Sequence, residues 1–193
     1  MKKFLSILFF LVVFFQAKVW AEPVNYDEVK RDVVALYNTN KLQEAYQLAA
    51  TIPEADRDAE VWLILANITQ DYDKDLDAVF LLSKAIEKNP KYYKAYYNLG
   101  NLYFEDNKLT KAVQNYELAV KYNKDFAYGY YNLGCCYLKD ALFSRAKSYF
   151  LKAIKLKPNE PIFYYNLALT YKKMNKNKQA ARALDVYNKL VQE

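Results

Sequence analysis

The sequence predicts an all-α chain, a solenoid in which helix-turn-helix units are stacked one on another. The first reason is a repeat: the phrase YYNLGNLY, which begins at Tyr96, returns as YYNLGCCY from Tyr130 and again, weakened, as YYNLALTY from Tyr164. These starts are equally spaced, and a fixed period of roughly 34 residues is typical of stacked arrays. The second reason is composition, because 53% of the residues are apolar but only 3 are Gly and 5 are Pro. Such a chain can bury a core, yet it has too few turn residues for many short strands.

Residues 1–21 have the layout of a secretory signal peptide. Lys2 and Lys3 form a basic start, an apolar run extends from Phe4 to Phe15, and Val-Trp-Ala, ending at Ala21, gives a cleavage signal. The apolar run is short for a membrane span. We therefore expect an exported protein, periplasmic or secreted, with no stable membrane insertion after cleavage. The alternative is a protein tethered to the membrane by an uncleaved segment.

Residues 22–58 predict an atypical helical hairpin that caps the array. Apolar spacing favours a helix from Tyr26 to Tyr37, and a second, Ala-rich helix from Leu42 to Ala50. The letters NKLQEA from Asn40 echo NKLTKA from Asn107, and the two starts are one position short of two full periods apart. Terminal units of a stack are expected to be irregular, because one of their faces meets water.

From residue 59 the period predicts four regular units, at 59–92, 93–126, 127–160 and 161–193. Each has two helical stretches with apolar residues at i, i+3 and i+4, separated by a short polar turn such as the one at Asn107. Small residues on both helices predict a close backbone approach, and a helical Gly costs about 1 kcal/mol relative to Ala, so two in one register indicate a steric need. These small positions are Ala66, Gly100, Gly134 and Ala168 in the first helices and Ala78, Ala112, Ala146 and Ala180 in the second.

This arrangement resembles the tetratricopeptide repeat family, whose pattern is W-x2-L-G-x2-Y…A-x3-F…P over about 34 residues. The resemblance covers residues 59–193, and residues 25–54 weakly. Departures include Thr69, where later units have Tyr, and Tyr187, where earlier units have Ala. The resemblance implies a right-handed superhelix whose concave face, lined by the first helices, is the usual binding surface.

Projected onto this sequence, the concave face gives columns with one residue per unit. One of them, the Tyr column, consists of Tyr97, Tyr131 and Tyr165, and packing is expected to leave it free to face the groove. The columns become more apolar toward the C-terminus and pass from acidic to basic, which suits an apolar or aromatic peptide or helix face with acidic residues beside it. The alternative is that Tyr is simply this chain's usual aromatic residue on helix surfaces. The predicted partner-binding residues are Tyr97, Asn101, Phe104, Tyr128, Tyr131, Leu138, Lys139, Tyr165, Leu169, Lys172 and Lys173.

Several classes of function find no support in the sequence. With 0 His, no His-based catalytic pair or usual zinc site can form, and no Gly-rich phosphate loop occurs. Four aspartates between Asp71 and Asp77 alternate as in a calcium loop, but the required Gly and closing Glu are absent. After residue 21 the chain carries 25 basic and 22 acidic residues, too even a balance for a nucleic-acid binder. We therefore expect no enzyme activity, no cofactor, no metal and no nucleic-acid partner.

The prediction is an exported scaffold that binds a protein or peptide in its concave groove. One alternative is a carrier or chaperone for an apolar ligand. Another is an assembly subunit that self-associates through its C-terminal helix, where Val186, Leu190 and Val191 are apolar. Cys135 and Cys136 are expected to be packing residues, with Cys135 facing the groove, where it can pair with a partner's thiol.

Overall fold

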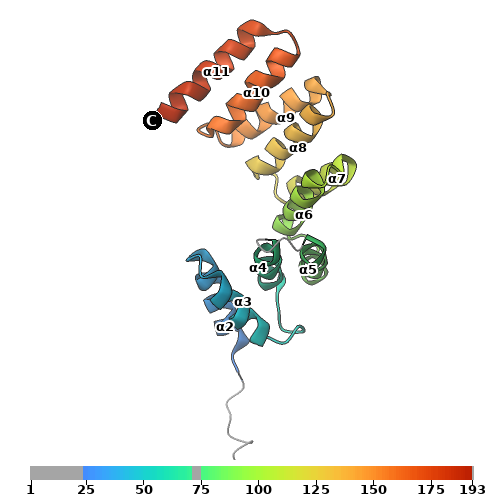
Figure 1. Ribbon diagram of the computed structural model, residues 1–193, viewed down its shortest axis with the longest axis vertical. Coiled ribbons are helices and arrows are strands. Elements are labelled where there is room, and N and C mark those ends of the chain that lie inside the picture. Colours follow the sequence, from blue (N-terminus) through green and yellow to red (C-terminus); the bar gives the residue numbers. More distant parts are fainter. Residues whose placement is uncertain (1–23, 71–74, 193) are drawn as a thin grey trace, which may run out of the picture.

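The computed structural model of the protein describes residues 24–70 and 75–192, in which ten α-helices form and no strand occurs. The predicted signal segment and the Asp-rich turn at 71–74 lie outside the described residues. The helices pair in chain order and the pairs stack along the long axis, from the α2–α3 hairpin at one end to α10 and α11 at the other (Figure 1). This is the all-α solenoid that the repeat predicts.

The helix bounds follow the period of the sequence. From α4 onward, the first helices of the pairs begin at equally spaced positions. The pairs are α2 (Tyr26–Asn38) with α3 (Leu42–Thr51), α4 (Ala59–Gln70) with α5 (Asp75–Lys88), α6 (Tyr93–Glu105) with α7 (Leu109–Tyr122), α8 (Ala127–Lys139) with α9 (Phe143–Leu156), and α10 (Pro161–Lys173) with α11 (Asn177–Gln192). Among the described helices, none combines the length and the apolar character that a bilayer crossing requires.

The close approach predicted from Gly100 and Gly134 is present. A Cβ atom added to Gly134 would lie 2.6 Å from the ring of Phe150, and one added to Gly100 would lie 2.4 Å from the ring of Tyr116. Both rings are buried, and each occupies the space that a Cβ atom on the facing glycine would need. Where the first helix has Ala instead, the second helix has the smaller Leu. The four pairs of equivalent positions are Ala66 with Leu82, Gly100 with Tyr116, Gly134 with Phe150, and Ala168 with Leu184.

A left-handed residue ends the first helix of four pairs. Asn40, Asn107 and Asn175 have φ near +58°, as has Ala141 with φ 57°. The next residue donates its N–H to the carbonyl five residues back, for example Leu142 to Tyr137 at 2.8 Å, which completes a Schellman motif. Asn tolerates this conformation well, but Ala does not. Because the other turns have Asn at this position, their sequences did not predict a left-handed conformation for Ala141.

Replacing Ala141 by Asn is expected to raise the free energy of unfolding by about 0.5–1 kcal/mol, because Asn relieves the left-handed strain that Ala bears. Asn107→Ala makes the reciprocal change in the preceding unit and is expected to lower stability by a similar amount. Urea unfolding followed by circular dichroism measures both. Equal stability of the wild type and Ala141→Asn would contradict the assignment of strain to this turn.

The α2–α3 hairpin differs from the later pairs. Helix α3 has 10 residues, whereas α5, α7 and α9 have 14 each. Asp58 then caps α4 by accepting hydrogen bonds from the N–H groups of Glu60 and Val61, at 3.0 and 2.9 Å. On α2, Glu28 and Asp32 are exposed at positions where the later first helices bury small or apolar residues. A polar outer face of this kind is expected of the first unit in a stack.

Candidate partner-binding groove

A hollow of about 260 Å³ lies between the first helices α6 and α8, on the face predicted to bind a partner. Three predicted residues line it together: Asn101 and Phe104 from α6, and Tyr131 from α8. Its remaining lining residues are Glu105, Tyr116, Asn132 and Cys135. Lys139 stands at its edge, with its ammonium 4.9 Å from the centre of the Phe104 ring. The hollow thus combines aromatic walls, amide groups and one charge of each sign.

A ladder of amide hydrogen bonds runs along this face from unit to unit. The Asn98 Nδ2 donates to the Asn67 Oδ1, and the Asn132 Nδ2 donates to the Asn101 Oδ1 at 2.9 Å. The equivalent Asn166 Nδ2 lies 3.7 Å from the Cys135 Sγ. Each bond joins two first helices that are neighbours in the stack, so these polar residues fix the position of one unit relative to the next.

Asn101 joins the ladder to a buried residue of α7. Its Oδ1 accepts a second hydrogen bond from the hydroxyl of Tyr116, at 2.9 Å, so one oxygen ties α6 to α7 and to α8. Tyr116 is only 1% exposed, and burial raises the pKa of its phenol well above the ordinary value. The hydroxyl therefore stays protonated and needs this acceptor.

The prediction that packing leaves the Tyr column free is wrong for its first two members, Tyr97 and Tyr131. Tyr97 makes an edge contact with the Phe126 ring, at 4.9 Å between ring centres. Tyr131 stacks on Phe163 of the next unit at the same separation, and its hydroxyl accepts from the Asn166 Nδ2 at 2.7 Å. Burial raises the pKa of both phenols. Phe126, just before α8, and Phe163, within α10, thus cover one side of these rings, which the column alone did not indicate.

Tyr128 is also held by its neighbours. Its hydroxyl donates to the Glu160 Oε2 and accepts from the Lys157 Nζ at 2.7 Å, while its ring lies edge-on to Phe163. The hydrogen bonds from Lys157 and Tyr128 lower the pKa of the Glu160 carboxyl. Tyr128 thus joins the α8 start to the turn that precedes α10.

The other predicted residues remain accessible to different degrees. Tyr165 is 46% exposed, and its ring centre lies 5.4 Å from that of Tyr187 in a tilted arrangement. Leu138 and Leu169 are half-buried, and Lys139, Lys172 and Lys173 are exposed. Residues on α10 do not line the hollow between α6 and α8, so the predicted set divides into the hollow and a more open C-terminal part.

The two cysteines are free thiols. Cys135 lines the hollow and Cys136 is buried, which agrees with the expected faces. Burial raises the pKa of Cys135 to about 11 and that of Cys136 to about 12. Because the thiolate is the reactive form, neither residue is primed for thiol exchange near neutral pH. Within the described residues, no cluster of three His, Cys, Asp or Glu side chains forms a candidate metal site.

Comparison with known families settles the nature of the units. A model described as "TPR repeat" matches residues 100–140, and two models described as "Tetratricopeptide repeat" match 127–160 and both 81–114 and 149–184. Together they span residues 81–184, more than half of the chain. The chain belongs to the tetratricopeptide repeat family.

Solved structures share the fold of this tetratricopeptide repeat protein. A crystal structure of MamA has a TM-score of 0.72 at 22% identity, covering 82% of this chain and 93% of that one. A MamA double mutant gives 0.75 at 18% identity, covering 89% and 97%. Pseudomonas aeruginosa PilF gives 0.76 at 20% identity, covering 84% and 75%. At such identities the likeness shows the fold alone. No curated protein matches the chain.

Sequence reasoning missed three members of this tetratricopeptide repeat site. Tyr116 was not among the predicted partner-binding residues, yet it lines the hollow and its hydroxyl donates to Asn101. Glu105 and Asn132 line the hollow although neither was among the predicted partner-binding residues. The signal for Asn132 was available, since Asn recurs at this place in all three copies of the repeated phrase, as Asn98, Asn132 and Asn166.

Proposed function

We propose that this protein is an exported, non-enzymatic scaffold that binds a peptide or a partner protein in its concave groove. The observation that carries the proposal is the hollow between α6 and α8, where Asn101, Phe104 and Tyr131 from two consecutive units converge. Tetratricopeptide repeat proteins generally bind protein partners. The export part of the proposal rests on residues 1–21, which lie outside the described residues.

The size and lining of the hollow favour one side chain of a partner over a whole small molecule. Pockets for drug-sized ligands are usually about 300–1,000 Å³, and this hollow is about 260 Å³. Phe104 and Tyr131 offer aromatic contact, while the amides of Asn101 and Asn132 lie within reach of a peptide backbone. An apolar or aromatic residue is therefore the preferred occupant.

The exposed lysines indicate which residues flank that side chain. Lys139 lies beside the hollow, and Lys172 and Lys173 follow one unit later, at the C-terminal end of α10. Extended along the groove, a peptide would bring acidic residues or a terminal carboxylate to these ammonium groups. Exposed charges of this kind affect the rate of association and its salt dependence more than the final affinity.

Affinity capture from the source cell tests the proposal with matched variants. Leu138→Glu and Leu169→Glu place a charge in the groove, whereas Leu151→Glu places the same charge on the exposed side of α9, where Leu151 is 43% exposed. We expect the two groove variants to lose the partners that the wild type retains, and Leu151→Glu to keep them. Equal capture by all four proteins would overturn the groove proposal.

A second candidate, self-association through α11, is favoured by one observation. Leu184 is 42% exposed, although the equivalent residues Leu82, Tyr116 and Phe150 are 0–1% exposed. Apolar surface of this kind favours a neighbouring molecule. Light scattering tests it: a dimer that Leu184→Lys converts to a monomer would support self-association, and a monomeric wild type would exclude it.

A further inference from the structure

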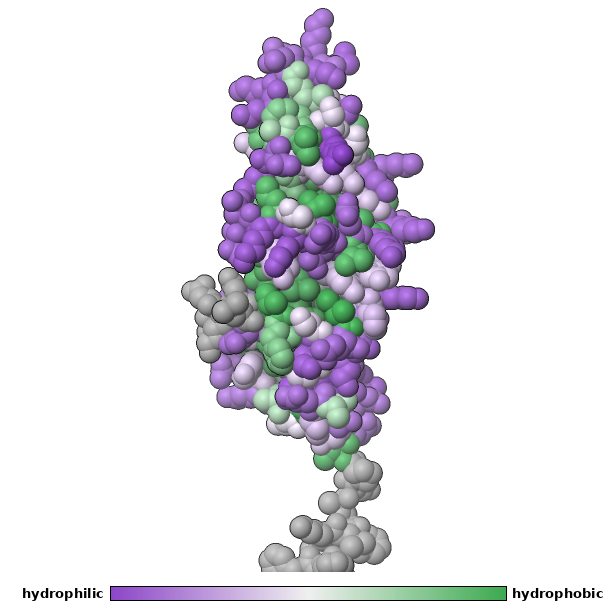
Figure 2. Space-filling view, turned by 90° about the vertical axis from the view of Figure 1, so that its right-hand side faces the viewer, coloured by the Kyte–Doolittle hydropathy of each residue, from purple (hydrophilic) through white to green (hydrophobic). Residues whose placement is uncertain are grey.

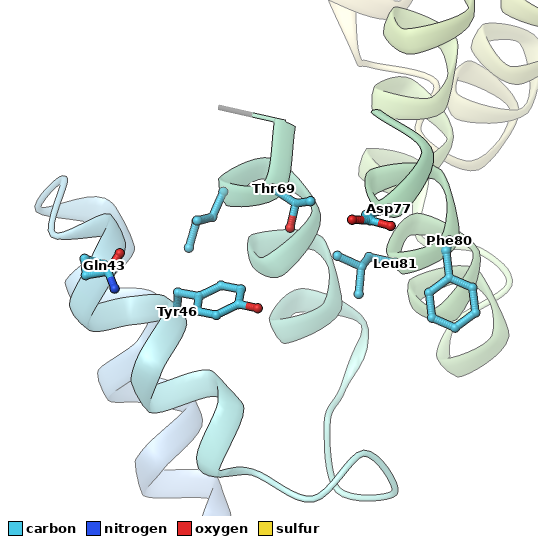
Figure 3. A pocket seen from close by; sticks show the side chains of 7 residues that line it. Gln43, Tyr46, Thr69, Asp77, Phe80 and Leu81 are labelled. Carbon is cyan, nitrogen blue, oxygen red and sulfur yellow. The ribbon is translucent and has the colours of Figure 1, made fainter. Parts of the chain in front are cut away.

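A second hollow lies away from the concave groove, beside Thr69 at the end of α4. It has a volume of about 490 Å³, and none of the predicted groove residues lines it. Tyr46 from α3 and Leu81 from α5 approach it from opposite sides, with Thr69 between them (Figure 3). The remaining lining residues are Gln43, Ile68, Asp77 and Phe80.

Thr69, which lines the hollow, stands where every later unit has a tyrosine. The equivalent residues, one per period, are Tyr103, Tyr137 and Tyr171. In the third regular unit that tyrosine fills its site: Tyr137 stacks on Tyr149 with ring centres 5.3 Å apart and ring planes 8° apart. The smaller Thr69 side chain instead donates its hydroxyl to the carbonyl of Leu65 at 2.7 Å within its own helix, so it supplies no ring to the hollow.

The charge beside this site is inverted in the same unit. In the next two units a cation stands at the position equivalent to Asp77 and covers the tyrosine ring: Lys111 lies 5.3 Å from the centre of Tyr103, and Arg145 lies 5.5 Å from that of Tyr137. At the equivalent position this unit has Asp77, an exposed acid. Both partners of an internal cation–aromatic contact are therefore absent, and a carboxylate occupies the place of the cation.

The surroundings make the hollow accessible and attractive to a cation. Tyr46 is 45% exposed and Phe80 is 59% exposed, so aromatic surface extends from the hollow to solvent. Figure 2 shows the side on which α5 and α7 lie, where hydrophobic surface is bordered by hydrophilic residues. Residues 22–92 carry 14 acidic and 8 basic side chains, whereas residues 93–193 carry 8 and 17. This half of the molecule attracts positive charge.

We propose that the hollow at Thr69 binds an aromatic side chain of a partner protein that has a lysine or arginine next to it. The ring takes the space that Tyr103 and Tyr137 fill in their own units, between Tyr46 and Leu81. The adjacent cation pairs with Asp77. This site differs from the concave groove in its lining residues, its helices and the sign of the charge that it selects.

A three-residue peptide, Ac-Lys-Tyr-Lys-NH2, probes the site in the purified protein. NMR signals of the Leu81, Ile68 and Thr69 methyl groups are expected to shift saturably, with a Kd on the order of 1 mM for so small a ligand. Ac-Lys-Ala-Lys-NH2 is expected to cause no such shift. Ac-Glu-Tyr-Glu-NH2 is expected to bind roughly 3-fold or more weakly, as for an exposed ion pair.

Two variants make the test specific. Thr69→Tyr supplies the missing ring from within and is expected to abolish the shifts at Leu81 and Ile68. Asp77 is exposed, and its replacement by Lys is expected to remove the preference for the lysine peptide over the glutamate peptide. The absence of a saturable shift in the wild type, unchanged binding by a folded Thr69→Tyr, or an unchanged preference in Asp77→Lys would each overturn the proposal. None of these outcomes depends on Leu138 or Leu169, so the groove proposal stands or fails separately.

Discussion

Replacing Gly134 by Ala is expected to lower the free energy of unfolding by about 1–3 kcal/mol, the usual cost of overpacking a core. Helix propensity by itself would stabilise the Ala variant by about 1 kcal/mol, because Ala is a better helix former than Gly. The steric term is expected to win, since the new Cβ would lie 2.6 Å from the Phe150 ring, which is fully buried and cannot swing into solvent. Urea unfolding measures the difference.

A second substitution shows whether the steric explanation is correct. Units with Ala at this position have Leu at the position of Phe150, as in the pair Ala66 and Leu82. Gly134→Ala combined with Phe150→Leu is therefore expected to recover stability relative to the sum of the two single changes, with a coupling of about 0.5–3 kcal/mol. Additive effects, or a Gly134→Ala protein as stable as the wild type, would contradict the close approach of α8 and α9.

Replacing Asn101 by Ala is expected to cost about 1–3 kcal/mol, because it leaves a buried donor without its acceptor. The donor is the hydroxyl of Tyr116, whose side chain is 1% exposed. The amide of Asn132 loses the same acceptor, so contacts from α6 to both α7 and α8 are affected. Urea unfolding again gives the magnitude.

Tyr116→Phe provides the control for this prediction. In the Asn101→Ala background the hydroxyl is already unpaired, so its removal is expected to cost less than in the wild type, or to restore some stability. If Tyr116→Phe costs the same in both backgrounds, the hydrogen bond to Asn101 does not stabilise the stack. Because Asn101 also lines the groove hollow, binding should be measured only on variants shown to be folded.

The helices, their pairing and the need for glycine at two positions could be predicted because each follows from spacing within one period. Gly100 and Gly134 illustrate this, since a small residue in the same register identifies the contact without any coordinates. Ala141 could not be predicted as a left-handed residue, because its turn lacks the Asn that marks the others. The positive φ there accompanies the same turn hydrogen bond, from Leu142 to Tyr137, that the Asn-containing turns make.

The candidate site was predicted less completely than the fold, as the Tyr column (Tyr97, Tyr131 and Tyr165) illustrates. Spacing gives the face of a helix on which Tyr97, Tyr131 and Tyr165 lie, but not how far the next unit covers that face. The structure buries much of the first two under Phe126 and Phe163 and leaves Tyr165 exposed. Similarly, Thr69 was recognised as a departure from the repeat, but only the structure reveals the hollow that Thr69 lines.

Hydroxyl-radical footprinting of the protein with a captured partner tests concave binding most directly, because it reports the accessibility of individual side chains. Binding in the groove predicts that the partner protects Phe104, Leu138, Tyr165 and Leu169. Leu151, which is exposed on α9, serves as the internal control and should be labelled equally with and without the partner. Protection of Leu151, with no change at Phe104 and Leu138, would contradict the proposal that the concave face binds the partner.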